Sequence, residues 1–97
     1  MDQMITLRLE AEREDDVYVA HCPDLDISSY GDTVEDAFAH LKDAVFLYLN
    51  TIEEDGERER IFRERGIKIE ERLRADYDVK VHPGVFATVS SFTVGVA

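Results

Sequence analysis

The sequence has little that would cross-link, anchor or export it. Cys22 is the only cysteine among 97 residues, so no disulfide can form within the chain. No run approaches the roughly 18–20 apolar residues of a membrane span. The opening segment, MDQMITLRLE, lacks the basic region and apolar block of a signal peptide. These absences predict a cytoplasmic protein in a reducing compartment, without membrane association.

Positive charge is also scarce. Three lysines and eight arginines stand against 22 acidic residues, which gives a formal net charge of −11. Such a surface repels the phosphates of nucleic acids and anionic lipids, so we expect no autonomous nucleic-acid binding. The same charge attracts a basic protein partner. It serves equally well for solubility or for adaptation to a salt-rich cell, and composition does not separate these interpretations.

The pattern of apolar residues predicts an antiparallel sheet in the first third of the chain. Residues 5–11 (ITLRLEA) alternate between apolar and polar, as a half-buried strand does. A charged turn is predicted at 12–16 (EREDD), and 17–22 (VYVAHC) is rich in strand-forming residues. Pro23 lacks an N–H group and ends this second strand. Residues 25–30 (LDISSY) predict a third.

A long helix follows at about 33–55. Gly31 supplies backbone freedom for the turn before it, Asp32 or Thr33 is the expected N-cap, and Gly56 is the expected end. Spacings of three and four residues place one apolar stripe on the face toward the sheet. The stripe consists of Val34, Phe38, Leu41, Val45, Tyr48 and Ile52.

The rest of the chain predicts one short helix and a β-rich extension. The charged segment 57–66 ends at a glycine, and 67–73 and 79–96 have strand-like patterns, the latter broken by a Pro-Gly pair. The sequence therefore predicts a single α+β domain over residues 1–97. Its core, about 4–56, is an antiparallel sheet of three to four strands with the long helix packed across it.

Exposed sheet edges and stray apolar residues predict self-association. A three-stranded sheet under one helix leaves two edges, which proteins usually cover. Leu47 points nearly opposite to the helix stripe, and Phe46 flanks the stripe. We predict a symmetric homodimer in which the tail strands pair with the other subunit, with Phe46, Leu47 and Phe92 as candidate interface residues. The competing prediction is a monomer whose tail folds back over its own sheet edge and over Leu47.

The segment YVAHCPDLDISSYGDTVEDAFAHLKDAVFLYL, residues 18–49, resembles the HicB antitoxin family. Members typically show Tyr-x-Ala-x-(Cys or Val)-Pro-(Asp or Glu)-Leu, then a helix start of the form Gly-Asp-Thr-x-Glu-(Glu or Asp)-Ala. The likeness covers about residues 4–56 and is fairly specific when taken as a whole. The matching positions are Tyr18, Ala20, Cys22, Pro23, Asp24, Leu25, Gly31, Asp32, Thr33, Glu35, Asp36 and Ala37.

The resemblance implies a partial ribonuclease-H-like fold and a function in binding. Family members usually neutralise HicA, a small basic ribonuclease toxin with a double-stranded-RNA-binding-like fold and a catalytic histidine, by occluding its active site. This chain departs from the family at Asp26 and Ile27, where many members have Pro-Gly, so the hairpin bend should differ. It also has no recognition helix in 67–97, where many members carry a DNA-binding domain. The alternative is a stand-alone oligomeric protein-binding module without a toxin partner.

A metal-dependent nuclease is the third possibility, and the residues argue against it. Two-metal cleavage needs several carboxylates around paired cations, yet the centre of the first strand, 6–9, has no acid. We interpret Asp24, Asp26 and Asp32 as solvated turn carboxylates. We predict no metal site and no cofactor, and titration with Mg²⁺ or Mn²⁺ should detect no specific binding.

Nucleophilic catalysis is not expected either. His21 and Cys22 are adjacent on a strand, so their side chains point to opposite faces and cannot pair. Cys22 is expected in the core, and His40 and His82 on the surface. No phosphate-binding loop, dinucleotide fingerprint or zinc-ligand spacing occurs in the sequence. We therefore predict that the chain is not an enzyme and has no catalytic residues.

Overall fold

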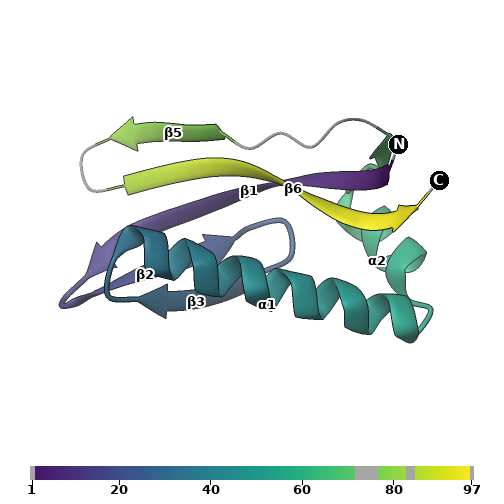
Figure 1. Ribbon diagram of the computed structural model, residues 1–97, viewed down its shortest axis with the longest axis horizontal. Helices are drawn as coiled ribbons and strands as arrows, with labels where there is room; N and C mark the ends of the chain where they lie inside the picture. Colours follow the sequence, from purple (N-terminus) through teal and green to yellow (C-terminus); the bar gives the residue numbers. More distant parts are fainter. Residues whose placement is uncertain (1, 72–76, 83–84, 97) are drawn as a thin grey trace.

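The first and last strands of the chain lie side by side in the middle of one sheet (Figure 1). The computed structural model describes residues 2–71, 77–82 and 85–96. The Pro-Gly pair that was expected to break the strand pattern at 79–96 lies outside these residues. The elements are β1 (Asp2–Glu14), β2 (Val17–Cys22), β3 (Ile27–Gly31), α1 (Val34–Glu54), α2 (Arg58–Arg65), β4 (Glu70–Glu71), β5 (Tyr77–His82) and β6 (Val85–Val96).

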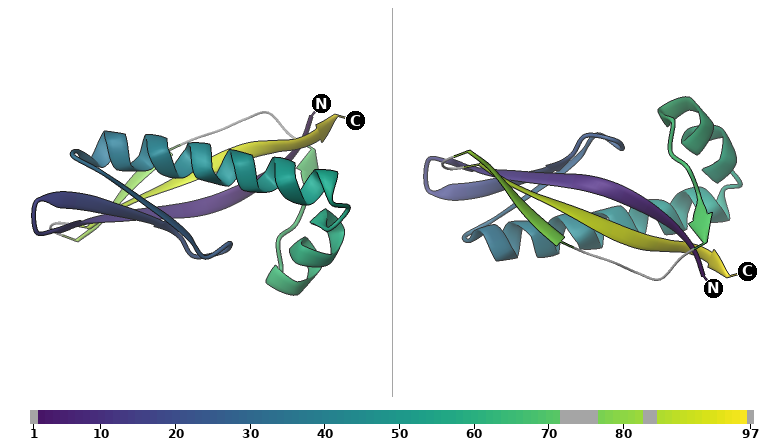
Figure 2. Two further views of the ribbon diagram at one scale, coloured as in Figure 1. Left: turned by 90° about the horizontal axis from the view of Figure 1, so that it is seen from below. Right: turned by 90° about the horizontal axis from the view of Figure 1, so that it is seen from above.

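The predicted α+β class is confirmed. The sheet is antiparallel throughout, with the order β3-β2-β1-β6-β5 and with β4 paired to the beginning of β1. The helix α1 packs across one face of this sheet (Figure 2). The β-rich extension joins the same sheet, because β6 pairs with β1 from Glu12↔Val85 to Asp2↔Val96. In the part of the chain that the structure describes, no helix is long and apolar enough to cross a membrane.

The first hairpin is longer than the sequence predicted. β1 runs through Glu14, and only Asp15 and Asp16 form the turn, with Asp15 at a φ of 53°. The predicted turn at 12–16 was therefore wrong for its first three residues. Glu12 and Glu14 are exposed, so water solvates their carboxylates while the backbone continues its ladder with β2. Charge alone does not end a strand when the charged side chains face water.

The start of α1 is fixed by the residues before it. Thr33 is the N-cap, and its Oγ1 accepts a hydrogen bond from the backbone N–H of Asp36 at 3.0 Å. Gly31 is buried, and a Cβ atom there would lie 2.6 Å from the backbone nitrogen of Ala37. Gly31 is thus required for the close approach of helix and strand, and not for a left-handed backbone. Gly56, just beyond the helix, does have a left-handed backbone, with a φ of 71°.

The core lies between α1 and the sheet. Ile5, Leu7 and Leu9 of β1 are buried beneath Leu41 and Val45 of the helix stripe. The helix also buries Leu49, which the predicted stripe omitted. Cys22 is fully buried in this core, as predicted.

Phe92 was wrongly predicted as an interface residue. It lies opposite Ile5 in the β1–β6 ladder, is only 8% exposed, and belongs to the core cluster. The reason is the pairing of β6 with β1, which turns Phe92 toward α1. The tail thus folds back on its own sheet, as the competing prediction stated, but it does not cover Leu47, which is 64% exposed.

The segment after α2 forms less strand than predicted. Only Glu70 and Glu71 of the expected strand at 67–73 pair within the described residues, as β4. The backbone N–H of Ile67 instead donates to the carbonyl of Phe62 at 2.8 Å and so closes the end of α2. Phe62 is buried in the core. Arg58 Nη1 donates to the carbonyl of Val94 at 2.6 Å and ties α2 to the end of β6.

Candidate functional site

The two faces of the sheet differ in what covers them. Ile5, Leu7 and Leu9 point toward α1, so the alternate residues of β1 point to the opposite face. We call that second side the open face. In Figure 2, neither α1 nor α2 lies over the part of it that β1, β2 and β3 form near their hairpin turn. The side chains there are available for contact with another molecule.

Three carboxylates follow one another along β1 on the open face. Glu10, Glu12 and Glu14 occupy alternate positions, about 7 Å apart along the strand. We call them the acidic row. Arg8 Nε donates to Glu10 Oε1 at 2.8 Å, and both side chains are exposed. An exposed pair of this kind contributes about 0–1 kcal/mol to stability, and Arg8 offsets the charge of Glu10, so the negative charge of the row comes mainly from Glu12 and Glu14.

Apolar side chains lie directly beside the acidic row. Val17 of β2 is opposite Glu14, and Val19 is opposite Glu12. Tyr30 of β3 is opposite Val19 and is 67% exposed. Directly opposed residues share one face of an antiparallel pair. Val17, Val19 and Tyr30, the apolar strip, therefore run parallel to the acidic row.

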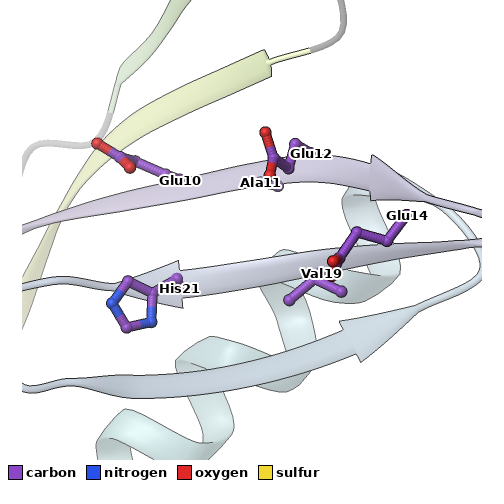
Figure 3. A pocket seen from close by; sticks show the side chains of 6 residues that line it. All are labelled: Glu10, Ala11, Glu12, Glu14, Val19 and His21. Atoms are coloured by element: carbon purple, nitrogen blue, oxygen red, sulfur yellow. The ribbon is translucent and has the colours of Figure 1, made fainter.

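Two adjoining hollows mark this surface. The first has a volume of about 250 Å³ and lies over the acidic row (Figure 3). The second has a volume of about 410 Å³ and follows the apolar strip and Ser28. Val19 lines both hollows, so the charged and apolar parts form one continuous surface across three strands.

A polar cluster closes one end of the surface. His21 lies opposite Glu10 on β1 and opposite Ser28 on β3. Its Nδ1 is 2.6 Å from Ser28 Oγ, and its Nε2 is 3.7 Å from Asp26 Oδ1. Serine, histidine and aspartate in this order resemble a nucleophile with its base. Asp26 and Ser28 are both exposed, however, so water competes for each contact.

The residues of the family motif build the scaffold behind this surface. Ala20, Leu25, Gly31 and Ala37 are buried, Tyr18 is half-buried against the core, and Thr33 caps α1. Pro23, Asp24, Asp32 and Glu35 are exposed in turns or at the helix start. Most motif residues therefore join β2, β3 and α1, and the acidic row and the apolar strip are not among them.

The predicted interface residues of α1 remain accessible. Phe46 is 56% exposed, next to Leu47 on the side of the helix away from the sheet. His40 is also exposed, and its Nδ1 lies 2.7 Å from the carbonyl oxygen of Tyr30. The side chain of His82 lies outside those that the structure describes.

The groups considered for chemistry are not brought together. Asp24, Asp26 and Asp32 are exposed, and the described residues contain no group of three or more side chains placed to hold a metal ion. Cys22 faces the core and His21 the open face. Burial raises the pKa of the Cys22 thiol, which keeps it protonated and unreactive at neutral pH.

Comparisons with models of protein families, with curated proteins and with solved structures gave no match to this chain. The resemblance to HicB proteins over about residues 4–56 therefore stays a prediction from the sequence.

Proposed function

We propose that the chain is a HicB-like antitoxin that acts in the cytoplasm. It binds a small basic ribonuclease toxin of the HicA type on the open face and occludes the toxin's active site. The observation that carries this proposal is the acidic row beside the apolar strip, on the face that α1 leaves uncovered. Carboxylates at the rim raise the association rate with a basic protein, and buried apolar anchors slow its dissociation.

The net charge of −11 also favours the binding of a basic protein. Opposite charges steer the encounter of two proteins and can raise the association rate by one to three orders of magnitude at low salt. Nucleic acid is repelled by the same field, so the antitoxin does not compete with the toxin for RNA. Neutralisation then requires contact with the toxin itself.

Co-expression tests the proposal. A short basic reading frame next to this gene is induced alone and with the antitoxin, and growth is recorded. We expect growth arrest by the first and recovery with the second. Replacing Glu10, Glu12 and Glu14 by glutamine should abolish recovery. The control, with Asp43→Asn, Glu54→Gln and Glu59→Gln, removes the same number of exposed charges from the helices and should still restore growth.

Recovery by both triple variants would exclude the acidic row as the toxin-binding site. If no neighbouring reading frame arrests growth, the alternative of a stand-alone binding module gains support instead.

We also propose that the chain forms a homodimer through the exposed part of α1. Phe46 and Leu47 present two large apolar side chains to water on adjacent positions. Light scattering should give about twice the chain mass of 11.1 kDa for the natural protein, and the chain mass for Phe46→Ser with Leu47→Ser. A natural protein that stays at 11.1 kDa at micromolar concentration would contradict dimerisation.

A further inference from the structure

We propose that the open face receives an amphipathic α-helix of the basic partner, lying along β1 and β2. One flank of this helix carries cations toward the acidic row, and the neighbouring flank places apolar side chains on Val17, Val19 and Tyr30. This inference rests on the proposed function, because it specifies the element of the partner that is bound.

The paired backbones of β1 and β2 disfavour an extended peptide lying across these two strands. β1 pairs with β2 on one side and with β6 on the other, and β2 pairs with β1 and β3. Over β1 and β2 the open face therefore presents side chains and no free ladder, and the nearest free edge of the sheet is that of β3. An extended peptide lying there would leave N–H and C=O groups against valine side chains, which is unfavourable. A helix satisfies its own backbone, so it brings only side chains to the surface.

The spacing of the charged groups fits a helix. The Cα atoms from Glu10 to Glu14 span four residues of strand, which is about 13–14 Å. Cations at positions i, i+4 and i+8 of a helix span about 12 Å, since each residue rises about 1.5 Å. One cation can therefore meet each carboxylate of the acidic row.

The width of the surface fits the same element. Val19 lies one strand away from Glu12, and Tyr30 lies two strands away. Neighbouring strands are about 4.8 Å apart, so the surface is about 10 Å wide. A helix with its side chains has a diameter of about 10–12 Å. A single helix therefore covers the acidic row and the apolar strip together, with its cations on the β1 side.

The charges within the site are not equivalent. Glu10 is already paired with Arg8, and it lies beside the polar cluster of His21. Among the described residues, no hydrogen bond or ion pair joins the carboxylate of Glu12 or of Glu14 to a cation. We therefore expect Glu12 and Glu14 to contribute most of the electrostatic attraction, and Glu10 less.

A designed peptide tests this inference without the natural partner. The probe is a helical peptide of about 18 residues with leucines on one flank and arginines at i, i+4 and i+8 on the next. One control has the same composition with the arginines opposite the leucines, and another has two central prolines that prevent a helix. Each is titrated into the full isotope-labelled chain. Amide shifts in NMR spectra locate the contact, and fluorescence anisotropy measures the affinity.

We expect the probe to bind at least tenfold more tightly than either control, with shifts at Val17, Val19 and Tyr30. Glu12→Gln with Glu14→Gln should weaken binding about tenfold, and Asp43→Asn with Glu54→Gln should leave it unchanged. Glu12→Lys with Glu14→Lys should prefer a probe whose arginines are replaced by glutamates.

Three results would overturn the inference. The proline peptide could bind as tightly as the helical probe, or the amide shifts could be confined to α1. The chain could also self-associate through the open face and so compete with the probe. A negative result in the growth assay does not imply a negative result in the peptide titration, and the reverse also holds. If the antitoxin bound the toxin through a loop or strand of the toxin, co-expression would still restore growth, yet the helical probe would stay unbound. If the probe binds but no toxin is found in the growth assay, the helix-binding site is supported and the antitoxin function is not.

Discussion

Two adjacent serines of β6 should respond in opposite directions to the same substitution. Ser90 and Ser91 are 2% and 1% exposed, and they point to opposite faces of the sheet. Ser90 lies opposite Leu7 on the side of α1, and its Oγ is buried without a hydrogen-bond partner among the residues that the structure describes. Ser91 lies opposite Thr6, and their hydroxyl oxygens are 3.4 Å apart.

The magnitude follows from the two environments. A buried hydroxyl without a partner destabilises the folded state by about 1–3 kcal/mol. Ser90→Ala removes that penalty and leaves a void of one oxygen atom, on the order of 10–15 Å³, which costs about 0.3 kcal/mol. We therefore expect Ser90→Ala to increase the free energy of unfolding by about 1 kcal/mol or more. Ser91→Ala loses a hydrogen bond and should decrease it by about 0.5–1.5 kcal/mol.

Urea denaturation followed by circular dichroism measures both changes. The midpoint should move to higher urea for Ser90→Ala and to lower urea for Ser91→Ala, with the slope unchanged. For a domain of this size, 1 kcal/mol corresponds to about 4–8 °C in Tm. A loss of stability in Ser90→Ala would refute the reasoning. It would mean that the hydroxyl has a partner in solution, such as a buried water molecule.

The remaining predictions concern the helix start and the buried thiol. Gly31→Ala should lower the free energy of unfolding by about 1–3 kcal/mol in the same urea assay, because its Cβ would lie 2.6 Å from the backbone nitrogen of Ala37. Thr33→Ala should lower it by about 1 kcal/mol, whereas Thr33→Ser should retain the cap and most of the stability. Burial raises the pKa of Cys22, so its stabilising contribution is complete below the pKa of an unfolded thiol and is lost as pH rises through the folded value. The natural protein should therefore lose stability relative to Cys22→Ala above about pH 8.5, and parallel pH profiles of the two proteins would contradict this.

Local sequence signals were sufficient to predict the bounds of α1, but they were insufficient to predict which strand β6 pairs with. The cap at Thr33 and the glycine at 56 fixed α1 to within one residue at each end. Leu49 was missed because the stripe was continued through Tyr48, although both positions face the sheet side. The strand-like pattern of 79–96 indicated a strand but carried no information about its neighbour. Phe92 was therefore assigned to an interface when the pairing with β1 places it in the core.

The candidate site was harder to predict because it depends on register. Glu10, Glu12 and Glu14 were visible as charged residues of a strand and its turn, but their neighbours lie on other strands. Val19 reaches Glu12 only through the register of the first hairpin, and Tyr30 reaches Val19 only through the second. The contact between His21 and Ser28 arises in the same way. Fixing each register from the sequence would have required the true length of both turns.

The pairing of β1 with β6 also has a consequence for how the chain folds. Thr6 and Ser91 are 85 positions apart in sequence, yet their side chains meet in the sheet. Contacts of such long sequence separation slow folding, since a large loop must close before they form. During synthesis, β2 can pair with β1 early, but the other edge of β1 stays unpaired until β6 has left the ribosome. In that interval the nascent chain offers an open strand edge to neighbouring chains. A partner or chaperone that is present during translation would therefore affect the yield of folded protein more than its final stability.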